Sequence, residues 1–376
     1  TSLMRRVTTS YALRPTPYAP TLLFAGGGTL GHIIPAVAVA REWMKQHPDA
    51  AVHFVCSPRG EAAFLEKEDL PHTILDAPRL SWNFPWKFFL AYQKSCTLLQ
   101  TLKPDLVFSK GGYISVPVCL AAKRIKIPII LHESDAVMGR ANRLIAKLST
   151  KICLGFPTHD SRSHHSPLTT YEFTGNPVRP EITHGSRAEG LRLTGFSGSR
   201  PILLIMGGSQ GAQAINEWTL QHLEDLTAVC DVIHLTGVGK QNRKSQIANR
   251  KYFPIDFAHK ELKDLYACSD IAISRSGAGS IAELAANGIA TVLIPLRGVA
   301  HDHQQANAVS LLEREAALLV TQNDMDNMLM NVVKQLIDDP AAREKLRRQI
   351  RGLCTGDSTG QIVKVISHAL VGRGRA

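Results

Sequence analysis

The sequence Ile273-Ser-Arg-Ser-Gly-Ala-Gly-Ser-Ile-Ala-Glu283 joins the end of an apolar strand, a turn of small residues and the start of a helix. The small residues 277–280 allow close approach of the backbone and leave the first N–H groups of the helix for an anion. Glu283 lies one turn further on, where its carboxylate can hydrogen-bond a sugar diol attached to that anion. The stretch predicts a nucleotide site; the alternative is a tight turn whose Glu only favours the helix N-terminus.

The same strand, glycine-rich turn and helix occur at two other places. One is Thr21-Leu-Leu-Phe-Ala-Gly-Gly-Gly-Thr-Leu-Gly-His32, and the other is Pro201-Ile-Leu-Leu-Ile-Met-Gly-Gly-Ser-Gln-Gly-Ala212. Strands alternate with helices between them, which predicts an α/β chain of two Rossmann-like domains, each with a doubly wound parallel sheet, facing each other across a cleft. We expect a disordered tail at 1–20, an N-terminal domain at 21–182, a C-terminal domain at 183–345, and a helix at 346–376 that packs back on the N-terminal domain.

The first glycine-rich turn excludes two common nucleotide sites. Gly26, Gly28 and Gly31 match the dinucleotide pattern, but the second strand, 52–56, ends without the acid that would bind a ribose. No Gly-Lys-Ser/Thr sequence follows, so the turn is not a Walker loop either. What remains is a backbone cradle for a phosphate or a sugar, with His32 at the start of the helix.

Composition restricts the class of protein. The chain has 376 residues, is 44% hydrophobic and carries a net charge of +11, which favours an anionic partner such as a nucleic acid, a nucleotide or an acidic lipid surface. The seven Cys are scattered singly, which indicates reduced thiols rather than a disulfide framework. No apolar run reaches the roughly 18 residues of a membrane span. The Arg-rich, acid-free start favours a disordered tail over a transit peptide.

A series of short sequences between Thr21 and Ala308 resembles the MurG family of bacterial GlcNAc transferases, and occurs in the family's order. They are Gly27-Gly-Thr-Leu-Gly-His32, Gly111-Gly-Tyr113, His132-Glu-Ser-Asp135, Gly175-Asn-Pro-Val-Arg179, Gly207-Gly-Ser-Gln-Gly-Ala212, Ser274-Arg-Ser-Gly-Ala278 with Glu283, and Gln304 with Asn307. The resemblance implies the GT-B fold and a hexosyltransferase of peptidoglycan synthesis, which serves cell-wall formation, cell shape and cell division.

The resemblance also implies the substrates. The donor would be UDP-GlcNAc and the acceptor lipid I, undecaprenyl-pyrophosphoryl-MurNAc-pentapeptide, whose MurNAc 4-hydroxyl receives GlcNAc to give lipid II. The enzyme would lie peripherally on the cytoplasmic face of the inner membrane, against an anionic surface, with no nucleic-acid partner.

Carried over position by position, the resemblance implies a set of substrate contacts: Thr29, Leu30, Gly31, Asp135, Asn142, Arg179, Ser209, Ala258, Ala278, Gly279, Ser280, Ile281, Ala282, Glu283, Gln304 and Gln305. The first three match the donor-sugar loop, Arg179 and Ser209 lie near the donor phosphates, and the two glutamines match the contact to the sugar 4-hydroxyl. Leu30 replaces a usual Gly, and Asp135 stands where the family commonly has Asn, which adds a negative charge near a dianionic donor.

The chemistry requires a base for the acceptor hydroxyl and stabilisation of the departing diphosphate. His32 is the candidate base, because an unperturbed imidazole titrates near neutral pH, and Glu133 is its rival. His32 could instead cap the helix or bind phosphate. A helix N-terminus assisted by Arg179 can hold the diphosphate without a metal ion. The only D-x-D sequence, 324–326, is interpreted as helix capping, so we expect no metal or other cofactor.

The segment Leu80–Lys94 concentrates aromatic residues, and seven basic residues follow in the same domain: Lys123, Arg124, Lys126, Arg140, Arg143, Lys147 and Lys151. The combination predicts a patch that binds anionic lipid. The alternative is that Trp82, Phe84, Trp86 and Phe88 belong to the core. Two other functions stay open: a sugar-nucleotide epimerase of the same fold, and a nucleotide-binding scaffold without catalysis.

Overall fold

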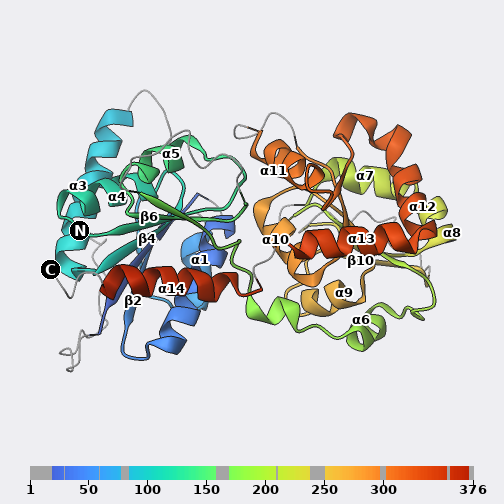
Figure 1. The fold of residues 1–376 in the computed structure, drawn as a ribbon, viewed down its shortest axis with the longest axis horizontal. Coiled ribbons are helices and arrows are strands. Elements are labelled where there is room, and N and C mark those ends of the chain that lie inside the picture. The colour runs from blue at the N-terminus through green and yellow to red at the C-terminus, as the bar shows by residue number, and fades with distance from the viewer. Residues whose placement is uncertain are drawn as a thin grey trace, which may run out of the picture.

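The computed structural model describes residues 19–28, 30–58, 60–77, 84–157, 169–208, 211–237, 250–296, 302–353 and 356–371. Two α/β domains lie side by side, each built on a parallel sheet (Figure 1). The expected tail at 1–20 falls outside these residues except for its last two positions. Thr29, Ser209 and Trp82 are also outside, as are the side chains of Leu30 and Phe84.

The first sheet has the strand order β3-β2-β1-β4-β5-β6-β7, and every described pairing is parallel. Its strands are β1 Thr21–Gly26, β2 Ala51–Cys56, β3 His72–Ile74, β4 Leu106–Gly111, β5 Ile129–Glu133, β6 Lys151–Leu154 and β7 Thr170–Phe173. Its helices are α1 Leu30–Gln46, α2 Glu61–Lys67, α3 Phe84–Leu102, α4 Ser115–Arg124 and α5 Arg140–Ala146. The order reverses between β1 and β4, where a doubly wound sheet binds its ligands.

Both faces of this sheet are buried, as the continuous apolar run of β1 predicts. Leu22 and Phe24 lie in the core shared with α1 and α2, whereas Leu23 and Ala25 lie in the core under α3, α4 and α5. The rings of Phe24 and Phe54 stack with centroids 5.0 Å apart. The sheet is therefore a rigid support for the loops at its carboxyl end.

The second sheet repeats the arrangement with the order β10-β9-β8-β11-β12-β13, again all parallel. Its strands are β8 Ile202–Met206, β9 Asp231–Leu235, β10 Tyr252–Ile255, β11 Ile271–Ser274, β12 Ala290–Leu293 and β13 Leu318–Leu319. Its helical segments are η1 Pro180–Thr183, α6 Arg187–Thr194, α7 Gln213–Gln221, α8 Leu223–Val229, α9 Leu262–Cys268, α10 Ala278–Asn287, α11 His303–Leu312, η4 Gln322–Asp324, η5 Met325–Leu329, α12 Met330–Asp338 and α13 Pro340–Arg351.

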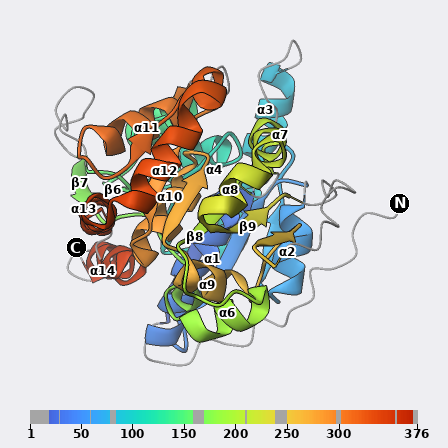
Figure 2. The same ribbon diagram turned by 90° about the vertical axis from the view of Figure 1, so that its right-hand side faces the viewer.

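Alternate residues of β8 again enter two cores. Leu204 packs with α9, α10 and α11, and Ile205 packs with α7, α8 and α12. Figure 2 views this domain end-on, with helices on both sides of β8 and β9. The prediction of two doubly wound parallel sheets is thus confirmed.

The chain crosses back to the first domain between α13 and α14, Ser358–Val371 (Figure 1). Ile362 and Ile366 of α14 are fully buried in the core beside α1. The expected boundary at 346 falls inside α13, whose Leu346 and Ile350 lie in the second-domain cores. Apolar burial keeps α13 with the second domain, and the crossing follows it. No helix in the described part of the chain is long and apolar enough to cross a bilayer.

Candidate active site

The start of α10 presents backbone N–H groups with free space beside them. Ala278, Gly279 and Ser280 form the first turn, whose N–H groups have no partner within the helix. Gly279 has an ordinary backbone conformation, and a Cβ added there would meet no atom within 4 Å. Neither strain nor packing accounts for a glycine at this position. A ligand that approaches the helix start does account for it, which favours the anion site over a merely tight turn.

Glu283 is held at the end of this turn by two side chains. The Tyr266 hydroxyl donates to Glu283 Oε2 at 2.8 Å, and an Arg179 terminal nitrogen lies 3.7 Å from Glu283 Oε1. Burial raises the pKa of Glu283, while the Arg179 charge and the Tyr266 hydrogen bond lower it. Arg179 Nε is buried without a hydrogen-bond partner among the described residues. The guanidinium therefore sets a positive charge beside the helix that carries Glu283.

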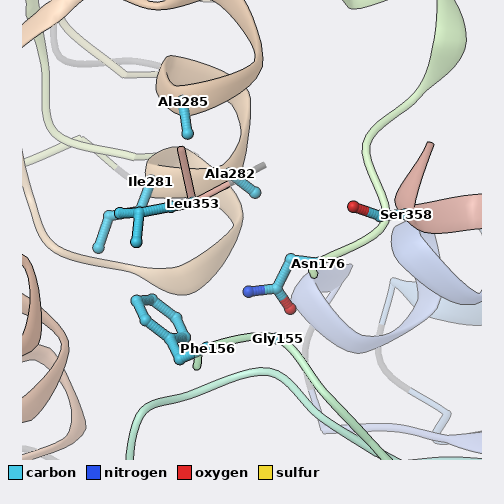
Figure 3. Close-up of a pocket in the computed structure, with 8 residues that line it drawn as sticks. All are labelled: Gly155, Phe156, Asn176, Ile281, Ala282, Ala285, Leu353 and Ser358. Atoms are coloured by element: carbon cyan, nitrogen blue, oxygen red, sulfur yellow. The ribbon is translucent and has the colours of Figure 1, made fainter. Parts of the chain in front are cut away.

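Two other residues of the predicted nucleotide turn face the protein instead. The Ile281 side chain is 3% exposed, and its N–H donates to the Gly277 carbonyl at 3.0 Å. Ile281 and Ala282 line a cavity between the two domains, with Phe156 and Asn176 on its other side (Figure 3). A ligand at the helix start thus has the N–H groups of 278–280 and the carboxylate of Glu283 available to it.

The two predicted glutamines begin α11. Gln304 Oε1 accepts from Leu296 N at 3.1 Å, and its carbonyl accepts from the Ser276 hydroxyl at 2.8 Å. These bonds tie α11 to the turn before α10. Gln305 Oε1 is buried and has no hydrogen-bond partner among the described residues. The resemblance to the family also implies a backbone contact to uracil at Phe257 or Ala258. Both residues follow β10 at the carboxyl edge of the same sheet, with Ala258 buried and the Phe257 ring exposed.

The glycine-rich turn of the first domain is packed by protein. Gly28 has φ +108°, and a Cβ there would lie 2.9 Å from the Tyr113 ring. Its N–H donates to Glu61 Oε1 at 2.7 Å, and Ser57 N donates to Glu61 Oε2 at 2.8 Å. The carboxylate of Glu61 thus occupies an N–H that a dinucleotide pyrophosphate would require. Gly31, at the second position of α1, is exposed.

His32 follows on the first turn of α1 and is partly buried. Burial is the main cause that lowers its pKa to about 4; the Lys110 charge lowers it further and the Asp135 charge raises it. The imidazole is therefore neutral at physiological pH and has a lone pair that can take a proton. A negative substrate bound beside it would raise this pKa and strengthen the base.

Glu133, the rival base, is 3% exposed at the end of β5. Its Oε1 accepts from Asp135 N at 2.9 Å, and its Oε2 accepts from Asn142 Nδ2 at 2.8 Å. Burial, followed by the Asp135 charge, raises its pKa to about 7. Since both oxygens are engaged within the protein, Glu133 shapes the loop after β5, and the more accessible His32 is the better-placed base.

Asp135 joins the two domains through Asn307 of α11, which is fully buried. Asn307 Nδ2 donates to Asp135 Oδ1 at 2.9 Å and to the Ser276 carbonyl at 3.0 Å, and Asn307 Oδ1 accepts from Ala136 N at 2.8 Å. His303 Nδ1 also lies 3.7 Å from Asp135 Oδ2. These bonds bring the carboxyl end of β5 against the turn before α10, so the two predicted half-sites adjoin.

The described residues contain no group of three or more His, Cys, Asp or Glu side chains arranged to hold a metal ion. Asp324, of the D-x-D sequence, accepts from the Thr321 hydroxyl at 2.5 Å in the turn where η4 begins.

Three residues of this region were not among the predicted substrate contacts: Lys110, Tyr266 and Asn307. Lys110 is a charge at the end of a buried strand, a signal that could have been read from the sequence. Tyr266 hydrogen-bonds Glu283, 17 positions away, and Asn307 hydrogen-bonds Asp135, 172 positions away. Only the fold reveals those pairs.

Comparison with known proteins agrees with this architecture. The glycosyltransferase family 28 N-terminal domain matches residues 22–154, and the family 28 C-terminal domain matches residues 202–353. The UDP-N-acetylglucosamine--N-acetylmuramyl-(pentapeptide) pyrophosphoryl-undecaprenol N-acetylglucosamine transferase of Legionella pneumophila (strain Paris) is 34% identical over 359 residues, which cover 93% of this chain and 97% of that protein. The enzyme of the same name from Lachnoclostridium phytofermentans is 35% identical, over 85% of this chain and 91% of its own.

Solved structures show the same fold. The crystal structure of Acinetobacter baumannii MurG is 25% identical, has a TM-score of 0.76, and covers 93% of this chain and 99% of that one. A Neisseria meningitidis UDP-GlcNAc 2-epimerase bound to UDP-GlcNAc shares the fold at 16% identity, with a TM-score of 0.62 over 94% and 100% of the two chains. From the family 28 domains and the relatives that match nearly its whole length, the chain belongs to the MurG family of GT-B glycosyltransferases.

Proposed function

We propose that this protein transfers GlcNAc from UDP-GlcNAc to the MurNAc 4-hydroxyl of undecaprenyl-pyrophosphoryl-MurNAc-pentapeptide, which converts lipid I to lipid II. The observation that carries the proposal is the contact of Asp135 with Asn307, because it sets the open helix start of one domain against the His32 side of the other. An anion site that faces a neutral imidazole suits a nucleotide-sugar donor and a hydroxyl acceptor.

In the proposed mechanism, Glu283 accepts the ribose hydroxyls and the first N–H groups of α10 receive the diphosphate. Arg179, with its unpartnered Nε, adds positive charge where the leaving UDP gains negative charge. His32 takes the proton of the acceptor 4-hydroxyl, which attacks the anomeric carbon from the face opposite UDP. An α-linked donor then gives a β1→4 product.

The lipid would be met by the outer face of α3. Trp86, Phe89 and Leu90 are 66%, 48% and 43% exposed, and the Trp86 and Phe89 rings stack with centroids 6.2 Å apart. Phe88 is partly buried, so the core alternative holds in part for it but not for Trp86. Exposed lysines at 87 and 94 of the same helix supply positive charge beside the rings. An exposed apolar group with a basic surround suits an anionic membrane surface, here proposed as the cytoplasmic face.

Replacing both exposed aromatics with serine, as Trp86→Ser with Phe89→Ser, should weaken binding to vesicles that contain phosphatidylglycerol by at least about tenfold, because the burial of two rings is lost. Turnover with a short-chain, water-soluble acceptor should stay near normal. Sedimentation with vesicles measures the first quantity, and Phe257→Ser, an exposed ring of the other domain, is the control. Equal vesicle binding of all three proteins would exclude α3 as the membrane contact.

A coupled assay of UDP release separates this function from the two alternatives. The purified protein should release UDP from UDP-GlcNAc only when lipid I is supplied. An epimerase would convert UDP-GlcNAc without any acceptor, and a scaffold would bind it and release no UDP in either case.

Glu283→Ala should weaken UDP-GlcNAc binding by about 1.5–3 kcal/mol, the value of a lost hydrogen bond to a charged group. Glu313→Ala, an exposed carboxylate at the end of α11, is the control for charge alone. Isothermal calorimetry measures both affinities, and the thermal midpoint checks folding. A Glu283→Ala protein that binds the donor as tightly as the control would remove this carboxylate from the donor site.

We also propose that catalysis requires no divalent ion, because helix N–H groups and a guanidinium can hold the leaving diphosphate. Treatment with EDTA should therefore leave most of the UDP release intact. The contrary result is a loss of turnover on chelation that Mg²⁺ or Mn²⁺ restores.

A further inference from the structure

Lys110 is a buried cation beside the proposed base, and the mechanism above does not use it. It is the last residue before Gly111 at the end of β4, and its side chain is 1% exposed. Removing an ammonium group from water is strongly unfavourable unless it is hydrogen-bonded and faces negative charge. The partners of Lys110 therefore indicate what it does.

The hydrogen bonds of Lys110 run to the strand β5 and to the loop after it. Its Nζ lies 2.7 Å from His132 Nδ1 and also donates to the Ser134 hydroxyl. His132 Nε2 lies 3.0 Å from the Gly175 carbonyl, which can only accept, so Nε2 carries the imidazole proton. Nδ1 is then the acceptor, and the ammonium group donates to it. Both partners are uncharged, and neither compensates the charge of Lys110.

Two carboxylates supply that compensation. Burial lowers the pKa of Lys110 to about 8, while the charges of Glu133 and Asp135 raise it. Glu133, with a pKa of about 7, carries only part of a charge near neutral pH. Asp135, the neighbour of Ser134, has its side chain against Asn307 of the other domain. The Lys110 ammonium group, bonded to the Ser134 hydroxyl, thus contacts the residue that directly precedes the carboxylate facing the second domain.

We propose that Lys110 is a positioning residue that serves as the counter-ion of Asp135: it fixes Ser134 and offsets the carboxylate charge where a dianionic UDP-sugar must approach. This inference rests on the proposed function. The Lys110 charge explains how the chain can have a carboxylate at position 135 near an anionic donor, since an uncompensated negative charge there would repel the donor.

The same ammonium group acts on the proposed base. A Cβ built on Gly26 would lie 3.2 Å from Lys110 Cβ and 3.6 Å from His32 Cβ, so the two side chains begin at neighbouring points. The Lys110 charge lowers the pKa of His32 and the Asp135 charge raises it. Among the other groups that face Lys110, His132 is held neutral by burial, which lowers its pKa, and Cys153 of β6, with its pKa raised to about 12, is uncharged.

The test is Lys110→Met in two backgrounds, the natural Asp135 and Asp135→Asn. Methionine keeps most of the length of the side chain and removes its charge. With Asp135 present, Lys110→Met should lower kcat/KM for UDP-GlcNAc about ten- to hundredfold, mainly through KM, since coupling between neighbouring charges is commonly of this size. In the Asp135→Asn background the same change should lower it less than about threefold, because no charge is left to offset. An equal factor in both backgrounds overturns the proposal.

Lys110→Gln separates charge from hydrogen bonding, because an amide can still donate to Ser134. A counter-ion role predicts that Lys110→Gln lowers kcat/KM as much as Lys110→Met does. In both variants the acid limb of the pH profile of kcat/KM should move to higher pH, because the Lys110 charge no longer lowers the pKa of His32. Restoration of activity by Gln with an unmoved limb would make the role a hydrogen bond alone. Thermal midpoints, measured for the natural protein, the two single variants Lys110→Met and Asp135→Asn, and their double variant, keep the question independent of transferase activity. Lys110→Met must lower the midpoint more when Asp135 is present than in the Asp135→Asn background, and the proposal fails if it does not.

Discussion

His32→Ala should lower kcat by about 10²–10⁴-fold, the usual contribution of a positioned proton acceptor. The imidazole is neutral because burial lowers its pKa to about 4, so its loss removes an acceptor that is ready at physiological pH. The affinity for UDP-GlcNAc should change little, since the proposed donor contacts, Glu283 and the start of α10, lie in the other domain. The measurement is steady-state kinetics with both substrates varied.

The control for this prediction is His184→Ala, an exposed imidazole after η1. If His32 instead binds the acceptor pyrophosphate, the loss should appear as a raised KM for lipid I with kcat near normal. A His32→Ala protein that keeps most of its kcat would transfer the role of base to Glu133 or Asp135.

The folded protein should lose about 3–5 kcal/mol of stability between pH 7 and pH 5. His32, His53 and His234 each have a pKa lowered by burial to about 4, so each binds a proton more readily when unfolded. Their contribution is complete above the unfolded pKa of 6.5 and is lost as the pH falls toward 4. Glu133 acts in the opposite direction, because its raised pKa penalises the folded state most at pH 7 and less at pH 5. Burial also lowers the pKa of His132, which adds to the loss, and raises the pKa values of Glu283 and Asp231, which oppose it as Glu133 does. Four imidazoles against three carboxyls leave a net loss on acidification.

Urea unfolding at pH 7 and pH 5 measures this difference. His53→Gln provides the matched variant, because His53 lies in β2 away from the site and its Nε2 is 2.8 Å from the Thr73 hydroxyl. The variant should lose about 2 kcal/mol less than the natural protein over this pH range. An unchanged pH dependence in the variant would show that buried neutral imidazoles are not its cause.

The fold could be predicted from the sequence because its signals are local. Apolar strands, glycine turns and helices follow one another in order, and β1 and β8 each open a sheet of the predicted kind. The open start of α10 could also be predicted from the sequence, because the small residues that leave space beside this helix end are consecutive in the chain. The pattern could not separate the open N–H groups of residues 278–280 from Ile281, whose burial depends on the packing of the whole domain.

The rest of the site depends on contacts between distant positions. The carboxylate of Glu61 holds the Gly28 N–H, and Asn307 binds Asp135 across the domain boundary. Local patterns show neither contact, since Glu61 and Asn307 alone read as ordinary helical residues. Asp135 is an example. The sequence shows only that it adds a negative charge, whereas the structure shows a buried cation, Lys110, whose pKa that charge raises.

The proposed reaction transfers a sugar onto a lipid, so an assay that follows the sugar itself tests it. Purified protein is incubated with lipid I and UDP-GlcNAc that carries radiolabel in the sugar, and the mixture is extracted with butanol. The label should enter the butanol phase only when lipid I is present, and acid hydrolysis of that phase should yield a labelled β1→4 GlcNAc–MurNAc disaccharide. Label that stays in the aqueous phase while the protein binds UDP-GlcNAc normally would show that the protein does not carry out this transfer.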